Sequence, residues 1–282
     1  MIVCKELEKS FETKEQLFDA LRASKKDIIG IKKAQILKSS DKDSRITIKA
    51  RPLDFSKING ADKTIAFDDN YYYVAVNSTR ILDSHQDLHL DNLWNKSVKD
   101  LQGKNYLVDT HVLSINTTIV RKEYIEMLTA IVPFSMIGKD YPGDTEILIY
   151  KFPKDKVINK IAKEWLDSGD DIEASVKMRY TDIVLAMNSN NKEDKAELEN
   201  YNKYYDIIAN KDDFEDEIYY FWGIKQAQNV QESSLVLFGS NNATGPVQDS
   251  NKIEQSDDTQ KQVEAAEALQ KRKQLIINTL NH

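Results

Sequence analysis

Short segments rich in β-branched and aromatic residues recur along the chain, and polar turns separate them. One of them alternates Ile46 and Ile48 with Thr47 and Lys49, which is the period of a strand with one buried face. These segments predict strands over residues 28–36, 45–50, 71–76, 106–118 (one strand or a pair), 146–152, 172–187, 217–225 and 234–238. A chain with so many short strands needs a sheet or a barrel.

Apolar residues at helical spacing interrupt these strands in a few places. They predict amphipathic helices over residues 13–24, 122–132, 155–166 and 193–209. Strands and helices therefore do not alternate strictly, which argues against a doubly wound parallel sheet. We expect an α+β fold, with a mostly antiparallel β-barrel flanked by helices.

Composition limits the class of protein. The 282 residues, 40% of them hydrophobic, can bury a substantial core. The formal charge is −7, and no basic run is dense enough to neutralise many phosphates, so we expect no nucleic-acid partner. A single cysteine, Cys4, excludes an internal disulfide framework and fits a reducing compartment. Without an apolar leader or a long apolar run, the sequence predicts a cytoplasmic protein with no membrane partner.

The composition changes after Gly245 and Pro246, where polar residues replace those that could be buried. We expect one domain over residues 1–245, a linker over 246–260 and a flexible C-terminal tail over 261–282 that ends in a helix. An isolated helix of that length is marginal in water, so the tail would need a partner.

A polar stretch after the third predicted strand resembles a metal site. Asp83, His85, Asp87 and His89 occupy every second position, so a strand would project all four from one face. A strand rises about 3.3 Å per residue, however, which would separate the first and last by about 20 Å. Only an adjacent pair could share an ion. We expect no metal here and no cofactor, because the chain also lacks a glycine-rich phosphate loop and a zinc-protease motif.

Three residues on different predicted strands could together form a hydrolytic site. Ser175 lies in the strand after the 155–166 helix, Glu232 lies near the last strand, and His111 lies among strand-forming residues. A serine hydroxyl attacks a carbonyl only when a base takes its proton, and imidazole suits that task at neutral pH. A carboxylate behind the imidazole fixes its tautomer. The rival nucleophiles, none with a better claim than Ser175, are Ser114, Ser233, Ser234 and Ser240.

The order of these segments resembles a known family. The matching features, in chain order, are Asp83, Asp87, Trp94, His111, a helix that leads to Ser175, the segment Glu232-Ser-Ser-Leu-Val and a Gly-Ser-Asn-Asn-Ala turn. Over residues 65–245 this arrangement resembles the prohead (capsid maturation) proteases of tailed phages, which are related to the herpesvirus assemblins. The resemblance does not include residues 1–65 or the tail.

The resemblance implies a helix-flanked, assemblin-like β-barrel and a serine endopeptidase. His111 would be the general base and Ser175 the nucleophile, with Glu232 in the place of the third histidine of assemblins. Backbone amides in the later turn would hold the oxyanion; the candidates are Gly239, Ser240 and Asn241.

The same resemblance implies partners and a location. The substrates would be segments of the scaffold protein and the major capsid protein, cut inside the immature shell in the host cytoplasm. From composition rather than from the resemblance, we expect that the linker before the tail could itself be cut and that the tail helix could bind scaffold or shell protein. Because assemblins dimerise, a homodimer is also open, although no interface can be identified from the sequence.

Two alternatives remain open. Lys177 stands where the phage proteases have a small residue, in a Ser-x-Gly motif, and this favours a non-enzymatic protease-like scaffold protein. A metal-dependent hydrolase that uses Asp83, His85 and Asp87 is the second alternative.

Overall fold

A computed structural model describes residues 1–38, 48–49, 53, 68–168, 172–214 and 217–237. All of them belong to one compact unit, Met1–Asn242. The predicted linker and tail helix lie outside the described residues. Among the described helices, none is long and apolar enough to span a membrane.

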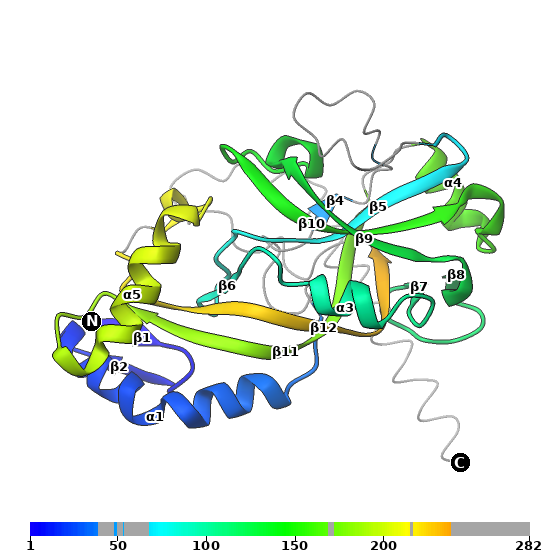
Figure 1. The fold of residues 1–282 in the computed structure, drawn as a ribbon. Helices are drawn as coiled ribbons and strands as arrows, with labels where there is room; N and C mark the ends of the chain where they lie inside the picture. The colour runs from blue at the N-terminus through cyan, green and yellow to red at the C-terminus, as the bar shows by residue number, and fades with distance from the viewer. Residues whose placement is uncertain (39–47, 50–52, 54–67, 169–171, 215–216, 238–282) are drawn as a thin grey trace, which may run out of the picture. The chain divides into compact units, whose positions relative to one another are not determined.

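The described chain contains short helices and many strands in a mixed order (Figure 1). Its first half consists of β1 (Ile2–Cys4), β2 (Lys9–Phe11), α1 (Lys14–Ala34), β3 (Leu37–Lys38), β4 (Ile48–Lys49), β5 (Tyr71–Ser78), β6 (Asp87–His89), α3 (Asn95–Asp100), β7 (Tyr106–Asp109) and β8 (Thr118–Val120). The second half consists of β9 (Glu126–Pro133), β10 (Asp144–Pro153), α4 (Lys160–Ser168), β11 (Glu173–Met187), α5 (Lys195–Tyr204) and β12 (Tyr220–Val236).

Most of the strands pair in an antiparallel manner. β1 and β2 form a two-stranded sheet, and β5, β10 and β9 form a second sheet in that order. The largest sheet has the order β3-β11-β12-β7-β8, with β4 added to β11 and β6 added to β12. Among the described strands, only β6 and β7 run parallel to β12. The α+β class with a mostly antiparallel sheet is therefore confirmed.

The predicted closed barrel is not found among the described residues; the strands divide into separate sheets instead. The reason lies in the packing of β5 and β10, which are buried on both faces. Tyr72 and Val74 of β5 join the core that also contains residues of the largest sheet, whereas Tyr73 and Ala75 join a second core with Phe134. Alternate residues of a strand point to opposite faces, so this sheet forms a layer between two cores.

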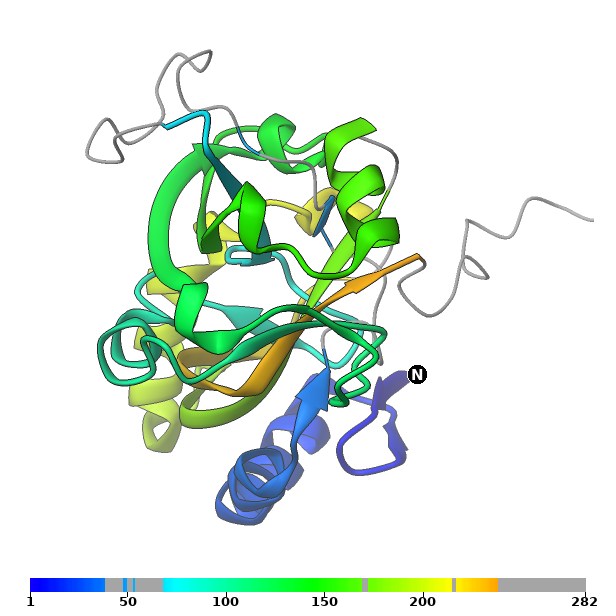
Figure 2. The same ribbon diagram turned by 90° about the vertical axis from the view of Figure 1, so that its right-hand side faces the viewer.

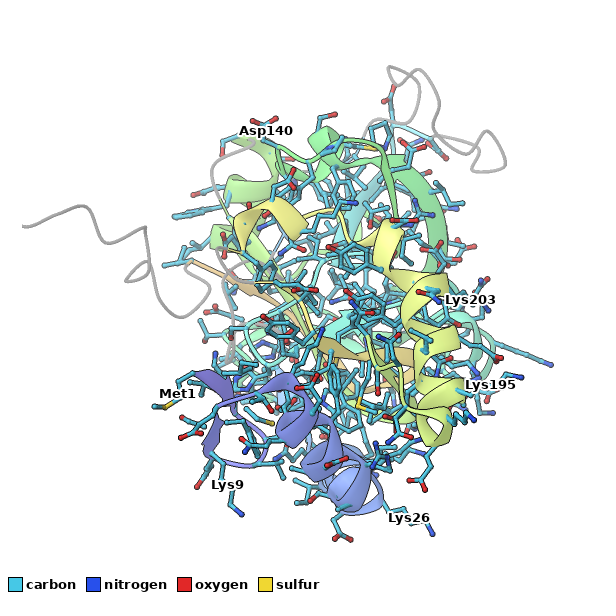
Figure 3. All side chains as sticks on the ribbon, turned by 90° about the vertical axis from the view of Figure 1, so that its left-hand side faces the viewer. Met1, Lys9, Lys26, Asp140, Lys195 and Lys203 are labelled. Carbon is cyan, nitrogen blue, oxygen red and sulfur yellow. The ribbon has the colours of Figure 1, made fainter. Side chains whose placement is uncertain are left out.

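The helix α1 packs beneath the largest sheet, on the side opposite β5, β10 and β9 (Figures 1 and 2). Thr13 caps its first turn by accepting a hydrogen bond from Gln16 N–H. Figure 3 shows α1 and α5 on the same side of the molecule, with Lys26 projecting outward. Arg22 of α1 is held to the residue that precedes α5, because its Nε donates to Asp194 Oδ1 at 2.7 Å.

The predicted strand at 28–36 is wrong, since residues 28–34 continue α1. Ile28 and Lys32 lie one helical turn apart and are both buried. Burial on one helix face thus outweighs the local strand preference of β-branched residues.

The predicted helix at 122–132 is also wrong. Apart from one short turn of 3₁₀ helix (Lys122–Tyr124), this segment forms β9, which pairs with β10 over its whole length. The expected helical stripe required Ile131 to be buried, but this residue is 47% exposed. The predicted strands at 217–225 and 234–238 are parts of one 17-residue strand, β12, whose polar middle belongs to the ladder.

Other predicted elements are confirmed, with shifted ends. They are the first part of α1, the strand β5, the pair β7 and β8, the strands β10 and β11, and the helices α4 and α5. For residues 45–50, the structure describes only 48 and 49, which form β4.

Candidate active site

Ser175, His111 and Glu232 form a continuous hydrogen-bonded chain. Ser175 Oγ lies 2.7 Å from His111 Nε2. On the other side of the imidazole ring, His111 Nδ1 lies 3.0 Å from Oε1 and 3.1 Å from Oε2 of Glu232. Along the chain, Ser175 lies 64 positions and Glu232 lies 121 positions after His111, so only the fold brings the three residues together.

Ser175 and Glu232 come from the two longest strands, which are neighbours. Ser175 of β11 lies opposite Ser234 of β12, and Glu232 is two residues from Ser234. Because strand side chains alternate with period two, Ser175 and Glu232 lie on the same face of the sheet. The distance between the neighbouring strands β11 and β12 thus separates the Ser175 and Glu232 side chains, which leaves room for the His111 imidazole between them.

The ladder between these strands is irregular next to Glu232. Val176 pairs with Ser233 and Met178 pairs with Asn229, so three residues of β12 face Lys177 alone. One of the three, Gln231, has a positive φ of 69°, which is uncommon for a residue other than glycine. Such bulges often occur next to functional sites, where they redirect a side chain.

His111 lies in a tight turn immediately after β7. The turn is closed by Val112 N–H, which donates to Asp109 O at 3.1 Å. Both central residues have positive φ, 49° at Thr110 and 57° at His111. This is the φ pattern of a type I′ turn, which favours glycine and asparagine. A β-branched residue and a histidine in that conformation store strain, which accumulates at functional sites.

The candidate triad is buried. The side chains of His111 and Glu232 are 4% and 0% exposed, and Ser175 is fully buried. A buried carboxylate is costly unless it is hydrogen-bonded, and both oxygens of Glu232 contact the imidazole. Hydrogen bonds are also electrostatically stronger in such an environment than in water. The Ser175 hydroxyl is therefore closed to solvent in this structure.

The sequence also singles out the oxyanion-hole candidates and Lys177 near the proposed site. Gly239, Ser240 and Asn241 lie outside the described residues. Lys177 Nζ donates to Gln231 Oε1 at 3.1 Å, across the bulge. The long cation is therefore held at the exposed part of the ladder.

The rival serines have other hydrogen-bond partners. Ser114 Oγ lies 2.9 Å from Thr117 Oγ1 in an exposed loop. Ser233 Oγ accepts from Asn229 Nδ2, and Ser234 Oγ accepts from the backbone N–H of His111. Among the four described serines considered, Ser175 has the hydrogen bond to the imidazole.

The residues of the apparent metal site are used in the fold. Asp83 Oδ1 accepts from the backbone N–H groups of His85 and Asp87, at 2.8 and 2.9 Å. Asp87 forms a buried ion pair with Lys32, and His89 Nε2 lies 3.1 Å from Tyr180 Oη. Within the described part of the chain, no three His, Cys, Asp or Glu residues come together as a metal site.

This polar segment contains two shifted pKa values. Burial, followed by repulsion from Asp87, raises the pKa of Asp83 to about 7. Burial lowers the pKa of His89 to about 4, so this histidine is neutral near pH 7. His89 is the last residue of β6, which pairs with β12 at Trp222 to Ile224, eight to ten residues before Glu232, and Asp83 lies in the turn that precedes β6.

Sequence reasoning missed Lys32 as the partner of Asp87. A lysine one turn after a buried isoleucine, on the apolar face of a helix, was the available signal. It also missed the contribution of Ser234 to the turn at His111, for which the sequence offers no local pattern.

Comparison of the chain with protein-family models, with curated proteins and with solved structures found no match.

Proposed function

We propose that this protein is a serine endopeptidase. The single observation that supports this most is the hydrogen-bonded order of Ser175, His111 and Glu232. Nucleophile, base and orienting carboxylate are each within hydrogen-bond reach of the next, which is the geometric criterion for a triad.

In the proposed reaction, Ser175 Oγ attacks the carbonyl carbon of the scissile peptide while His111 Nε2 takes its proton. Glu232 holds the proton on Nδ1 and stabilises the imidazolium. Breakdown of the tetrahedral intermediate transfers the proton from Nε2 to the leaving amine and leaves an acyl-enzyme. Water, deprotonated by the same imidazole, then releases the acid product and restores Ser175.

The resemblance to prohead proteases supports a more specific proposal about substrates. They would be segments of the scaffold protein and the major capsid protein, cut within the immature shell in the host cytoplasm. The assemblin-like arrangement would take the form of two sheets around a shared core. A homodimer and a targeting role of the tail are also part of this proposal.

A cleavage experiment with matched serine variants tests the function. The full chain would be co-expressed with the scaffold and major capsid proteins, and intact masses would be compared for the wild type, Ser175→Ala and Ser114→Ala. We expect the wild type and Ser114→Ala to give the same fragments and Ser175→Ala to give none. Identical fragments from Ser175→Ala would show that the catalytic assignment is wrong.

A second candidate function is a non-enzymatic assembly protein built on a protease-like fold. The complete burial of Ser175 favours it, because a buried hydroxyl is closed to substrate. In that case the wild type would give no fragments, and a fluorophosphonate, which labels activated serines, would leave Ser175 unmodified. Metal analysis of the purified protein addresses the hydrolase alternative.

A further inference from the structure

Two hydrogen bonds attach the backbone of the turn that carries His111 to β12. Thr110 N–H donates to Leu235 O at 3.0 Å, and His111 N–H donates to Ser234 Oγ at 2.9 Å. The first uses a backbone oxygen that any residue would supply. The second depends on the identity of one side chain, because only a hydroxyl at position 234 offers this acceptor.

The hydroxyl of Ser234 is oriented to accept. Its own proton has backbone carbonyls available, Val108 O at 3.0 Å and Leu235 O at 3.1 Å. With the proton used in this way, the lone pairs of Oγ face the His111 amide. Ser234 is fully buried, so water is not available to replace this acceptor. Val108 also belongs to β7, so the hydroxyl connects the strand before the turn with the turn itself.

Ser234, which accepts the hydrogen bond from the His111 amide, lies next to the other two residues of the proposed triad. Ser234 lies directly opposite Ser175 in the β11–β12 ladder and two residues from Glu232 on β12. The same residue that fixes the backbone of His111 is therefore next to both hydrogen-bond partners of its imidazole. A backbone shift at His111 would change both ring contacts at once.

The turn needs such an anchor because its conformation is strained. The positive φ values of Thr110 and His111 are sparsely populated for these residue types and persist only where surrounding contacts hold them. Loss of one anchor would let the turn relax towards negative φ, which moves the imidazole.

We infer that Ser234 is a positioning residue that holds the His111 imidazole between Ser175 and Glu232 through the backbone amide of His111. This inference rests on the proposed function for its catalytic consequence. Its structural part, the placement of the ring, can be measured without activity.

The test compares Ser234→Ala with two matched variants of the full chain. Ser234→Thr keeps the hydroxyl and serves as the rescue, and Ser233→Ala removes a neighbouring buried hydroxyl that has no contact with the His111 amide. The readouts are the rate constant and the apparent binding constant for labelling of Ser175 by a fluorophosphonate, and the nitrogen-15 NMR signals of the His111 ring. Thermal melting verifies folding.

We expect Ser234→Ala to label Ser175 about 10- to 100-fold more slowly, with the probe's binding constant unchanged and the ring signals shifted. Ser234→Thr and Ser233→Ala would label at rates near that of the wild type. Wild-type labelling rates and ring signals in Ser234→Ala would overturn the inference.

Misfolding of Ser234→Ala and failure of the wild type to be labelled are two further outcomes, and each can be distinguished from failure of the inference. If Ser234→Ala does not fold, Ser234→Cys replaces it, because a thiol of similar volume is a weak acceptor; slower labelling supports the inference and an unchanged rate refutes it. If the wild type itself is not labelled, the proposed function fails. The ring signals of His111 then decide the inference, because a shift in Ser234→Ala supports a positioning role and no shift contradicts it.

Discussion

His111 Nδ1 lies within 3.1 Å of both carboxylate oxygens of Glu232, and neither side chain is more than 4% exposed. In the proposed reaction this contact keeps the proton on Nδ1, which leaves Nε2 free to accept the proton of Ser175. Glu232→Gln keeps the shape but removes the charge, and its amide group can donate to Nδ1, which favours the wrong tautomer. We expect the cleavage rate to fall by roughly 10³ to 10⁴.

The control for this prediction is Glu126→Gln. Glu126 pairs with Lys151 and its side chain is 52% exposed, so its loss should leave cleavage unchanged. Cleavage by Glu232→Gln at the rate of the wild type would show that the carboxylate has no part in the chemistry.

The three residues of the proposed triad are suggested by the chemistry of their side chains and by the order of their segments along the chain. Their meeting could not be derived from local patterns. It depends on β7 running parallel to β12, with Glu232 opposite Tyr106, and sequence periodicity does not encode such long-range pairing. The same limit explains why the polar middle of β12 predicts a gap between two strands, whereas the structure has one.

The segment around Asp87 illustrates a different limit. Its acidic residues and histidines favour a polar loop over a metal site, but composition alone does not reveal that several of them are buried. The deciding partner, Lys32, is 55 residues away on a segment partly predicted as a strand. A buried ion pair of this kind becomes visible only when both elements are in place.

Removal of Lys32 and removal of the charge of Asp87 from their buried ion pair should lower the free energy of unfolding by different amounts. Attractive interactions with Asp87 and Glu6 outweigh the effect of burial and raise the pKa of Lys32. Lys32→Met leaves the carboxylates of Glu6, Asp83 and Asp87 without their cation. Asp87→Asn leaves Lys32 with Glu6, 3.4 Å away. We expect Lys32→Met to lower the free energy of unfolding by about 3 to 5 kcal/mol, and Asp87→Asn by less.

Urea denaturation near neutral pH measures both values, and the double variant measures their coupling. Without the cation, the buried carboxylates bind protons more readily in the folded state. The stability deficit of Lys32→Met should therefore shrink as the pH falls. A deficit that is equal at neutral and acid pH would contradict the assigned role of Lys32.

His89 predicts a loss of stability in acid. Its pKa is about 4 in the folded protein because of burial, against an ordinary value near 6.5. The unfolded chain therefore binds the proton first as the pH falls. The contribution of the buried neutral imidazole to the free energy of unfolding is fully present above about pH 6.5. It decreases as the pH falls to about 4, by about 3 kcal/mol in total. His89→Gln, which retains an amide for Tyr180, should lack this part of the pH dependence.

The comparison requires the variant because Asp83 acts in the opposite direction. Its raised pKa, about 7, contributes stability at low pH that decreases as the pH rises. Asp83 is present in both proteins, so the difference between wild type and His89→Gln isolates the histidine. Parallel stability curves for wild type and His89→Gln would refute the prediction.

Gly223 and Gly30 predict opposite effects of the same substitution. A Cβ at Gly223 of β12 would lie 3.1 Å from Leu90 Cδ1 and 3.1 Å from Val184 Cγ2, whereas a Cβ at Gly30 of α1 would meet no atom within 4 Å. Gly223→Ala overpacks the core and should cost about 1 to 3 kcal/mol. Gly30→Ala lies inside a helix and should stabilise by up to about 1 kcal/mol. Thermal and urea unfolding of both variants measure the difference, and a stabilising Gly223→Ala would show that Leu90 and Val184 can move aside without cost.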